Sequence, residues 1–277
     1  MSNSIKRYLM GSDPKISIIT IAFNAKADLE RTVQSVIGQT YQNIEYIIID
    51  GGSTDGTVDV IKKYEKHIAY WVSEPDRGIS DAFNKGIVQA DEESYILMLN
   101  AGDTFLSSEG LQSSVGSFRE KIVSLQVRTD RGTVQPKSYD FSNVRYDGTL
   151  TSLQRYIQAA HLFHQATFVH KSIYMDVGMY DLSYMIRMDL DFFLRALQKY
   201  AVQFIAKPIV LYGTDGLSSR LSNRIRFKME EKKAVCSLLE HKGCGRYTVY
   251  FYTELPFYLV KKVLSAIKYG MMDWRVK

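Results

Sequence analysis

The sequence is poor in cysteine. Its 277 residues include two, Cys236 and Cys244, and both lie late in the chain. Two thiols are too few for a disulfide framework or for a zinc site made of four thiolates. We therefore expect the protein to work in a reducing compartment.

Long apolar runs are missing as well. No window reaches the roughly 18 consecutive apolar residues that a membrane-spanning helix needs. Lys6 and Arg7 are followed by no apolar stretch before Asp13, so the three-part pattern of a secretory signal is not met. These absences predict a cytoplasmic protein, and they leave open a peripheral location on the inner membrane face.

Two common nucleotide-binding signatures are absent. Neither G-x-G-x-x-G nor G-x-x-x-x-G-K-[ST] occurs, so dinucleotide and P-loop binding lose their usual support. Segment 51–56, GGSTDG, lacks the lysine of a phosphate loop and predicts a tight turn. The net charge of +5 is too small to indicate a partner, while 45% hydrophobic and 23% charged residues exclude wholesale disorder.

What the sequence does contain is an alternation of strand and helix patterns. Continuous β-branched runs predict buried strands, and apolar residues at helical spacing predict the segments between them. The expected strands are 16–23, 44–49, 68–72 and 95–99, and the expected helices are 28–37, 57–68 and 80–88. This order predicts an α/β fold with a mostly parallel sheet flanked by helices. Residues 120–160 show no stable period, and we expect irregular strands and loops there.

Ligands of such sheets bind at the carboxyl ends of the strands. The positions to watch are therefore those where each apolar run stops, namely Phe23 with Asn24, Asp50, 74–78 and 100–103. Three of these four places carry a carboxylate. Asp55 and Asp76 are also ordinary turn residues among Gly, Ser and Pro.

Three of the five histidines fall in one segment, HLFHQATFVH, at positions 161, 164 and 170. The segment alternates like a strand, which would send His161 and His164 to opposite faces. The pattern thus favours hydrogen-bonded or substrate-facing histidines over a metal site.

The segment 189–197, DLDFFLRAL, predicts a helix with one apolar face. Asp191 and Arg195 are spaced i, i+4 and should pair on its flank. Asp189 stands at the helix start, where a carboxylate caps the helix or faces a ligand.

Six segments in this order resemble one family. They are ISIITIAFN, IIIDGGSTDGT, SEPDRGISDAFNKG, YILMLNAGD, HQATFV and MDLDFFLRAL. Together they resemble the family 2 glycosyltransferases of the GT-A fold, especially those of bacterial surface polysaccharide assembly, over about residues 14–219. The resemblance implies a Rossmann-like GT-A catalytic domain at 1–219, with 220–277 as a basic, aromatic-rich helical extension.

The resemblance also assigns the donor site. It implies that Ala22, Phe23 and Asp50 hold the nucleotide base, commonly uridine, by stacking and by a carboxylate that accepts a base N–H. Four further residues match the segment that lines the nucleotide-sugar pocket in the family: Asp76, Arg77, Asp81 and Asn84. A guanidinium beside a diphosphate is chemically reasonable.

The metal motif departs from the family pattern. Two adjacent acids usually end the fourth strand, and Gly102 and Asp103 stand there in this chain. The resemblance implies that Gly102 contacts the nucleotide sugar and that Asp103 binds Mg²⁺ or Mn²⁺, which takes its other ligands from diphosphate and water. Such a metal neutralises charge on the leaving diphosphate.

The catalytic base follows from the same comparison. Asp189 matches the acid that removes a proton from the acceptor hydroxyl in inverting members, with Asp191 as the fallback, although Met188 replaces a common Glu. His164 and Gln165 match a segment on the acceptor side. Residues 213–219, GTDGLSS, resemble the loop that closes over the donor.

The last 58 residues fall outside the resemblance and carry the basic character. They hold 13 Lys and Arg against 5 Asp and Glu, an excess of +8, whereas residues 1–219 stand at −3. Residues 247–258 include six aromatics, and Lys261, Lys262 and Lys268 follow. Two interpretations are open: a helix on an anionic membrane surface, or an extension that packs its aromatics on the catalytic domain.

The sequence thus predicts an inverting glycosyltransferase, a hexosyltransferase. It would move a sugar from a nucleotide-diphosphate sugar, expected to be a UDP-sugar, to a saccharide or lipid-linked oligosaccharide acceptor. One alternative is a nucleotide-sugar binding protein without turnover, suggested by the loss of one acid from the pair at 102–103. Another is a basic adaptor for membrane or nucleic acid, but no nucleic-acid fold signature appears, and we expect no nucleic-acid partner.

Overall fold

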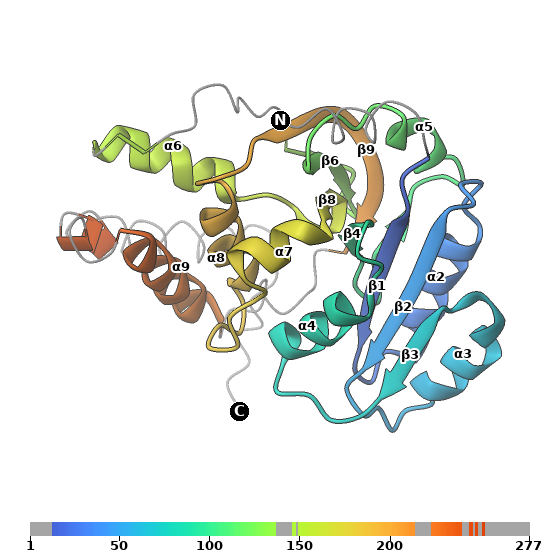
Figure 1. The fold of residues 1–277 in the computed structure, drawn as a ribbon. Coiled ribbons are helices and arrows are strands. Elements are labelled where there is room, and N and C mark those ends of the chain that lie inside the picture. The colour runs from blue at the N-terminus through green and yellow to red at the C-terminus, as the bar shows by residue number, and fades with distance from the viewer. Residues whose placement is uncertain are drawn as a thin grey trace.

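The apolar runs of the N-terminal half form the parallel side of one large sheet, with β3 at its edge (Figure 1). The structure is a computed structural model that describes residues 13–136, 146–147, 149–213 and 223–239, with residues 244, 245, 247, 248, 251 and 252. Its strands are β1 (Ile16–Ala22), β2 (Ile44–Asp50), β3 (Tyr70–Ser73), β4 (Tyr95–Met98), β5 (Thr104–Phe105), β6 (Ile122–Thr129), β7 (Val134–Gln135), β8 (Thr167–His170) and β9 (Val202–Tyr212).

The strand order is β3-β2-β1-β4-β8-β6-β9-β5, and β7 pairs with β6. Strands β3, β2, β1 and β4 run parallel to one another. Their continuous apolar runs are typical of parallel strands that are covered on both faces. Strand β8 enters antiparallel between β4 and β6. The predicted strands of this half match the structure to within two residues.

Helices connect and cover these strands. They are α2 (Lys26–Ile37), α3 (Thr57–Lys63), α4 (Ile79–Gln89), α5 (Gln112–Val115), α6 (Leu150–Ala160), α7 (Lys171–Val177), α8 (Met188–Ala196) and α9 (Arg224–Leu238), with short 3₁₀ turns η1 (Glu65–His67) and η2 (His164–Ala166). The parallel pairs are joined by α2, α3 and α4, because a parallel connection needs a crossover.

Adjacent residues of one strand serve two separate cores. Ile18 of β1 packs in the core beneath α2 and α3, whereas Ile19 packs in the core beneath α4. Both side chains are fully buried. The alternation of side chains along a strand places one core on each face of the sheet.

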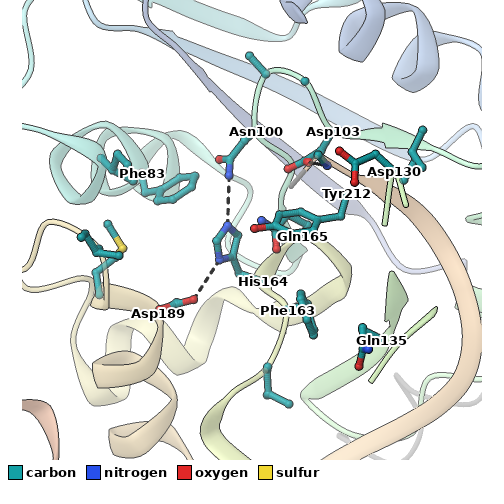
Figure 2. Close-up of a pocket in the computed structure, with 18 of the residues that line it drawn as sticks. Phe83, Asn100, Asp103, Asp130, Gln135, Phe163, His164, Gln165, Asp189 and Tyr212 are labelled. Carbon is teal, nitrogen blue, oxygen red and sulfur yellow. Dashed lines mark hydrogen bonds and ion pairs between the residues drawn. The ribbon is translucent and has the colours of Figure 1, made fainter. Parts of the chain in front are cut away.

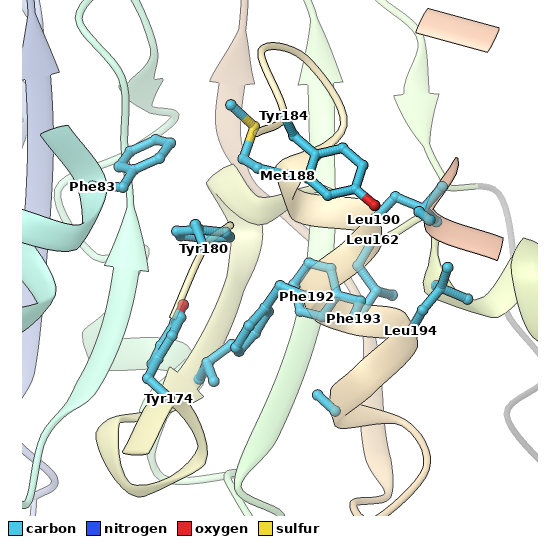
Figure 3. Packing of buried hydrophobic residues seen from close by; sticks show 14 of the residues in the cluster. Phe83, Leu162, Tyr174, Tyr180, Tyr184, Met188, Leu190, Phe192, Phe193 and Leu194 are labelled. Atoms are coloured by element: carbon cyan, nitrogen blue, oxygen red, sulfur yellow. The ribbon is translucent and has the colours of Figure 1, made fainter. Parts of the chain in front are cut away.

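The core on the α4 side is rich in aromatic rings and extends into the C-terminal helix (Figure 3). Tyr174 stacks on Phe192 with ring centroids 4.4 Å apart. Ala234 and Val235 of α9 belong to the same core, and so does the buried Phe251. The described part of the C-terminal extension therefore packs against the core on the α4 side of the sheet.

Two expectations for the middle of the chain are wrong in part. Residues 150–160 form a helix where irregular strands and loops were expected, whereas 122–129 form a buried strand with register shifts in its pairing with β9 between Ser124 and Val127. The strand expected through 161–170 begins at Thr167, because Phe163 to Thr167 turn through η2. The strand β6 is buried along nearly its whole length between neighbours, so it shows no polar alternation.

Cys236 at the end of α9 forms a disulfide with Cys244. This bridge was not expected, because the sequence analysis predicted a reducing compartment. Among the helices in the described ranges, each is too short or too polar to cross a bilayer.

Candidate active site

A cleft of about 990 Å³ opens beyond the carboxyl end of β4, between the β4–β5 turn and the start of α8. Five of the residues predicted for the site line it: Gly102, Asp103, His164, Gln165 and Asp189. Figure 2 shows Asp103 and Asp189 on opposite sides of this cleft, with His164 between them.

The turn after β4 depends on a glycine. Gly102 has φ +105°, a left-handed conformation that strains any residue with a side chain. Its amide donates to Oγ1 of Thr32, and that hydroxyl donates to the carbonyl of Asp103. A side chain at position 102 would therefore strain this turn.

Asp103 is a buried acid, 5% exposed. Its Oδ1 accepts the amide of Gly213 at 3.2 Å. Burial raises the pKa of this carboxyl to about 7, and the Gly213 amide and His164 oppose that shift only in part. Residues 214–219 of the expected donor loop lie outside the described residues.

His164 links the two sides of the cleft. Its Nε2 lies 3.3 Å from Nδ2 of Asn100, and its Nδ1 lies 3.4 Å from Oδ2 of Asp189. If the Asn100 amide donates to Nε2, the imidazole proton stands on Nδ1 and faces the carboxylate. Phe83 meets the imidazole edge at 5.8 Å between ring centroids.

Asp189 lies in the first turn of α8, with its side chain 19% exposed. Its Oδ1 accepts the amide of Leu190 at 2.7 Å. Burial raises the pKa of Asp189, but the hydrogen bond with His164 and the charge of Arg187 outweigh it and hold this pKa below its ordinary value. The group is an ionised carboxylate at neutral pH, able to accept a proton.

The loop before α8 is held by the C-terminal helix. The carboxylate of Glu230 accepts three consecutive backbone amides, from Met185, Ile186 and Arg187, at 3.1, 2.9 and 3.0 Å. Glu230 is 9% exposed. Charge-assisted hydrogen bonds of this kind are about twice as strong as neutral ones, so α9 fixes the approach to Asp189.

The remaining predicted donor residues lie away from this cleft. Asp50 is fully buried, and its carboxylate accepts the amides of Gly52 and Ser53 and the hydroxyls of Ser53 and Ser73. Phe23 is 65% exposed, and its side chain and that of Asp76 both lie close to Gly51. Ala22, which ends β1, is buried.

The other three positions are engaged with neighbouring residues. Arg77 pairs with Asp81 at 3.1 Å, and this pair together with the Arg77 amide lowers the pKa of Asp81. Asn84 exchanges two hydrogen bonds with the backbone of Tyr180, donating at 2.8 Å and accepting at 3.0 Å. Asn84 therefore joins α4 to the loop before α8.

Asp191, the fallback base, does not line the cleft. Its Oδ2 accepts from Nε of Arg195 at 3.0 Å, as the i, i+4 spacing predicted. The same guanidinium also donates to the carbonyls of Gly178 and Met179. The Asp191–Arg195 pair therefore anchors the loop that follows α7.

His161 and His164 both line the cleft, contrary to the expectation that they point to opposite faces. The reason is that His161 ends α6 and His164 begins η2, so strand alternation does not apply to them. Each has its own partners, Arg187 for His161 and Asp189 for His164.

Sequence reasoning missed Arg187, Glu230 and Phe227. Asn100 had been noted as a strand end but was assigned no role. Asn100 and Arg187 stand close in sequence to residues that were assigned, whereas Glu230 and Phe227 belong to a helix with no local signal of a site.

Comparison with known proteins decides the family. The profile described as "Glycosyl transferase family 2" matches residues 17–178. The chain belongs to this family. It is a glycosyltransferase, and its fold is the GT-A fold.

Relatives of this glycosyltransferase include the "uncharacterized glycosyltransferase Rv1514c" of Mycobacterium tuberculosis, 36% identical over 190 residues, 68% of this chain and 70% of that protein. A "PGL/p-HBAD biosynthesis glycosyltransferase" of Mycobacterium bovis is 29% identical over 192 residues, covering 68% and 72%. The "putative teichuronic acid biosynthesis glycosyltransferase TuaG" of Bacillus subtilis is 38% identical over 95 residues, covering 32% and 36%.

Two solved structures share the fold. Residues 1–349 of TarS from S. aureus, in complex with UDP, match with a TM-score of 0.62 and 15% identity, over 81% of this chain and 65% of that one. The mannosyltransferase PcManGT from Pyrobaculum calidifontis, in complex with GDP-Man and Mn²⁺, matches with a TM-score of 0.63 and 14% identity, over 98% and 81%.

Proposed function

We propose that this chain is an inverting transferase that moves a sugar from a nucleotide-diphosphate sugar, a UDP-sugar, to an acceptor hydroxyl, with Asp189 as the general base. The observation that carries the proposal is the ionised Asp189 carboxylate in the cleft, facing His164 and opposite Asp103. A positioned carboxylate that removes a proton typically contributes about 10²- to 10⁴-fold to the rate.

The donor would extend from the β1–β3 loops to the β4 turn. An exposed Phe23 beside Gly51 offers a face on which a base can stack. Asp50 would support that loop from beneath, since its carboxylate already accepts four hydrogen bonds. Asp76, Arg77, Asp81 and Gly102 would line the path to the diphosphate, with Asn84 and Ala22 behind them.

The residues at the β4 turn fit a divalent cation, Mg²⁺ or Mn²⁺. Asp103 is a buried carboxylate whose pKa is raised by burial, and Oδ1 of Asn100 is buried with no hydrogen-bond partner among the described residues. Both are hard oxygen donors that such ions prefer. When bound there, the ion would stabilise charge on the leaving diphosphate. In the described residues no cluster of three or more acidic, His or Cys side chains surrounds this point, so diphosphate and water would supply the other ligands.

We further propose an acceptor in polysaccharide or glycolipid biosynthesis, a saccharide or a lipid-linked oligosaccharide, on the inner membrane face. The printed names of two relatives, for teichuronic acid and for PGL/p-HBAD, support this setting. The basic residues beyond 252 would contact anionic lipid, while His164 and Gln165 would face the acceptor.

The test is turnover of a panel of UDP- and GDP-sugars with Mg²⁺, Mn²⁺ or EDTA. We expect hydrolysis or transfer with at least one UDP-sugar, loss of it in EDTA, and loss of metal stimulation in Asp103→Ala. Asp59→Ala, which removes an exposed acid on α3, is the matched control. Full activity in EDTA would contradict the proposed metal dependence. Activity with GDP-sugars alone would contradict the proposed UDP-sugar donor.

A second candidate is a nucleotide-sugar binding protein without turnover, which the glycine at 102 favours because it removes one acid from the usual pair. Thermal stabilisation by UDP without turnover of any donor would support this second function, since a ligand that binds the native state alone raises its stability.

A further inference from the structure

One cation in the cleft wall lacks a hydrogen-bonded anion. Arg187 lies two residues before Asp189, lines the same cleft and has a side chain that is 8% exposed. A guanidinium cannot be deprotonated at physiological pH, so its charge must be balanced where it is buried.

The guanidinium of Arg187 contacts an imidazole. Its Nη2 lies 2.5 Å from Nε2 of His161. Nδ1 of the same imidazole lies 2.7 Å from the carbonyl of Ile157, and Nε2 lies 3.7 Å from Oε2 of Glu231. Nε of Arg187 is buried without a partner.

The nearby carboxylates do not hydrogen-bond this cation, although the charge of Arg187 lowers the pKa of Asp189. Oε2 of Glu231 lies 3.8 Å from Nη2 of Arg187, beyond hydrogen-bond distance, and Oε1 of Glu231 bonds Nζ of Lys228 at 2.7 Å. Glu230 directs its carboxylate to backbone amides. Among the described residues, no carboxylate lies within hydrogen-bond distance of the guanidinium, and two cations share Glu231.

The guanidinium is nevertheless held in place. Its Cζ lies 4.3 Å from the ring centroid of Phe227 on α9, which also lines the cleft. Stacking on an aromatic ring fixes the plane of an arginine and leaves its edge for a second ligand. A fixed guanidinium is well suited to an oxyanion, which it can bind through two parallel N–H groups.

We propose that Arg187, with His161 and Phe227, forms a subsite for an anionic group of the acceptor, a phosphoryl or a carboxylate group near the hydroxyl that reacts. The inference rests on the proposed function, because Asp189 identifies this side of the cleft as the acceptor side. The donor diphosphate belongs across the cleft at Asp103 (Figure 2).

The test uses two small probes, glycerol 3-phosphate and glucuronate, titrated calorimetrically into the full chain. Variants are Arg187→Gln, Arg187→Lys and the matched control Arg155→Gln, which removes an exposed arginine from α6. We expect Arg187→Gln to weaken the binding of at least one probe about tenfold or more, Arg187→Lys to weaken it less, and the control to bind as the wild type does.

The outcomes distinguish a phosphoryl acceptor from a carboxylate acceptor, and they test whether the subsite exists. Dependence on Arg187 for glycerol 3-phosphate alone identifies a phosphoryl acceptor, and for glucuronate alone a carboxylate acceptor. Equal affinities in Arg187→Gln and Arg155→Gln, or no binding of either probe to the wild type, overturn the subsite. If circular dichroism shows that Arg187→Gln is unfolded, Phe227→Leu replaces it and must show the same loss. Neither probe requires a donor, so absence of sugar turnover would contradict the proposed function and leave this result standing.

Discussion

The carboxylate of Glu230 accepts the backbone amide of Ile186 at 2.9 Å, three residues before the catalytic Asp189 of our proposal. Two neighbouring amides bind the same carboxylate. A residue of the C-terminal helix is therefore part of the support of the active-site loop, although it contacts neither the cleft nor any substrate.

We expect Glu230→Ala to lower the free energy of unfolding by about 2 kcal/mol, because three amides lose a charged acceptor in a largely buried place. We also expect kcat to fall at least tenfold with KM for the donor nearly unchanged, since Asp189 is displaced. Glu230→Gln keeps an acceptor oxygen and should recover part of both. Urea unfolding and steady-state kinetics measure the two effects. Unchanged kcat in a destabilised Glu230→Ala would show that Glu230 has no positioning role.

Asp189→Asn should fold as the wild type does and lose about 10²- to 10⁴-fold in transfer, because the amide cannot accept the acceptor proton. Asp191→Asn is the contrasting variant. It breaks the pair with Arg195 and should lower the melting temperature while the folded fraction keeps its activity. Transfer assays together with thermal unfolding distinguish the two. Full transfer activity in Asp189→Asn would remove the base role.

The first half of the fold was predictable because each parallel strand is a continuous apolar run, such as Ile44–Asp50, and each ends at a recognisable turn. Asp189 and Asp103 were identified through the family resemblance. The helix at 150–160 was missed although Thr149 caps it and Leu153, Ile157 and Ala160 bury one face at helical spacing. The role of Glu230 was not predictable, because it depends on contacts between segments far apart in sequence. Arg187 and Glu230, for example, are 43 residues apart.

The pH dependence of the free energy of unfolding should show the contribution of the ionised Glu231 carboxylate. Burial raises its pKa, but His161, Lys228 and Arg187 outweigh burial and hold the pKa at about 2, below its ordinary value of 4.5. The unfolded chain therefore takes up this proton first as the pH falls. The stabilisation is full above about pH 4.5 and is lost toward pH 2, with a total of about 3 kcal/mol.

Urea unfolding at several pH values between 7 and 2 tests this point. Glu231→Gln should be less stable than the wild type at pH 7, and the difference should shrink as the pH falls through that window. Parallel stability curves for the two proteins would contradict the assignment.

Membrane contact by the chain beyond residue 252 is testable without truncating the folded part. Deleting all of 220–277 would remove Val235 and Phe251 from the core, so substitutions are the better choice. Changing Lys261, Lys262 and Lys268 to Gln should weaken binding to phosphatidylserine vesicles about a hundredfold, at about 1 kcal/mol for each lysine. Sedimentation at low and high salt measures this binding.

The control changes Lys62 of α3 and Lys66 of η1, both exposed, to Gln. It should bind vesicles as the wild type does. Equal binding by the triple variant and the control would refute a membrane role for these lysines.

The bond between Glu230 and the loop before α8 also bears on biosynthesis. A ribosome adds about 5–20 residues per second. The 43 residues that separate Arg187 from Glu230 thus take roughly 2–9 s to add after the loop has been translated. During that interval the nascent chain lacks the helix that secures the loop before Asp189, so this loop is secured only after α9 has been translated.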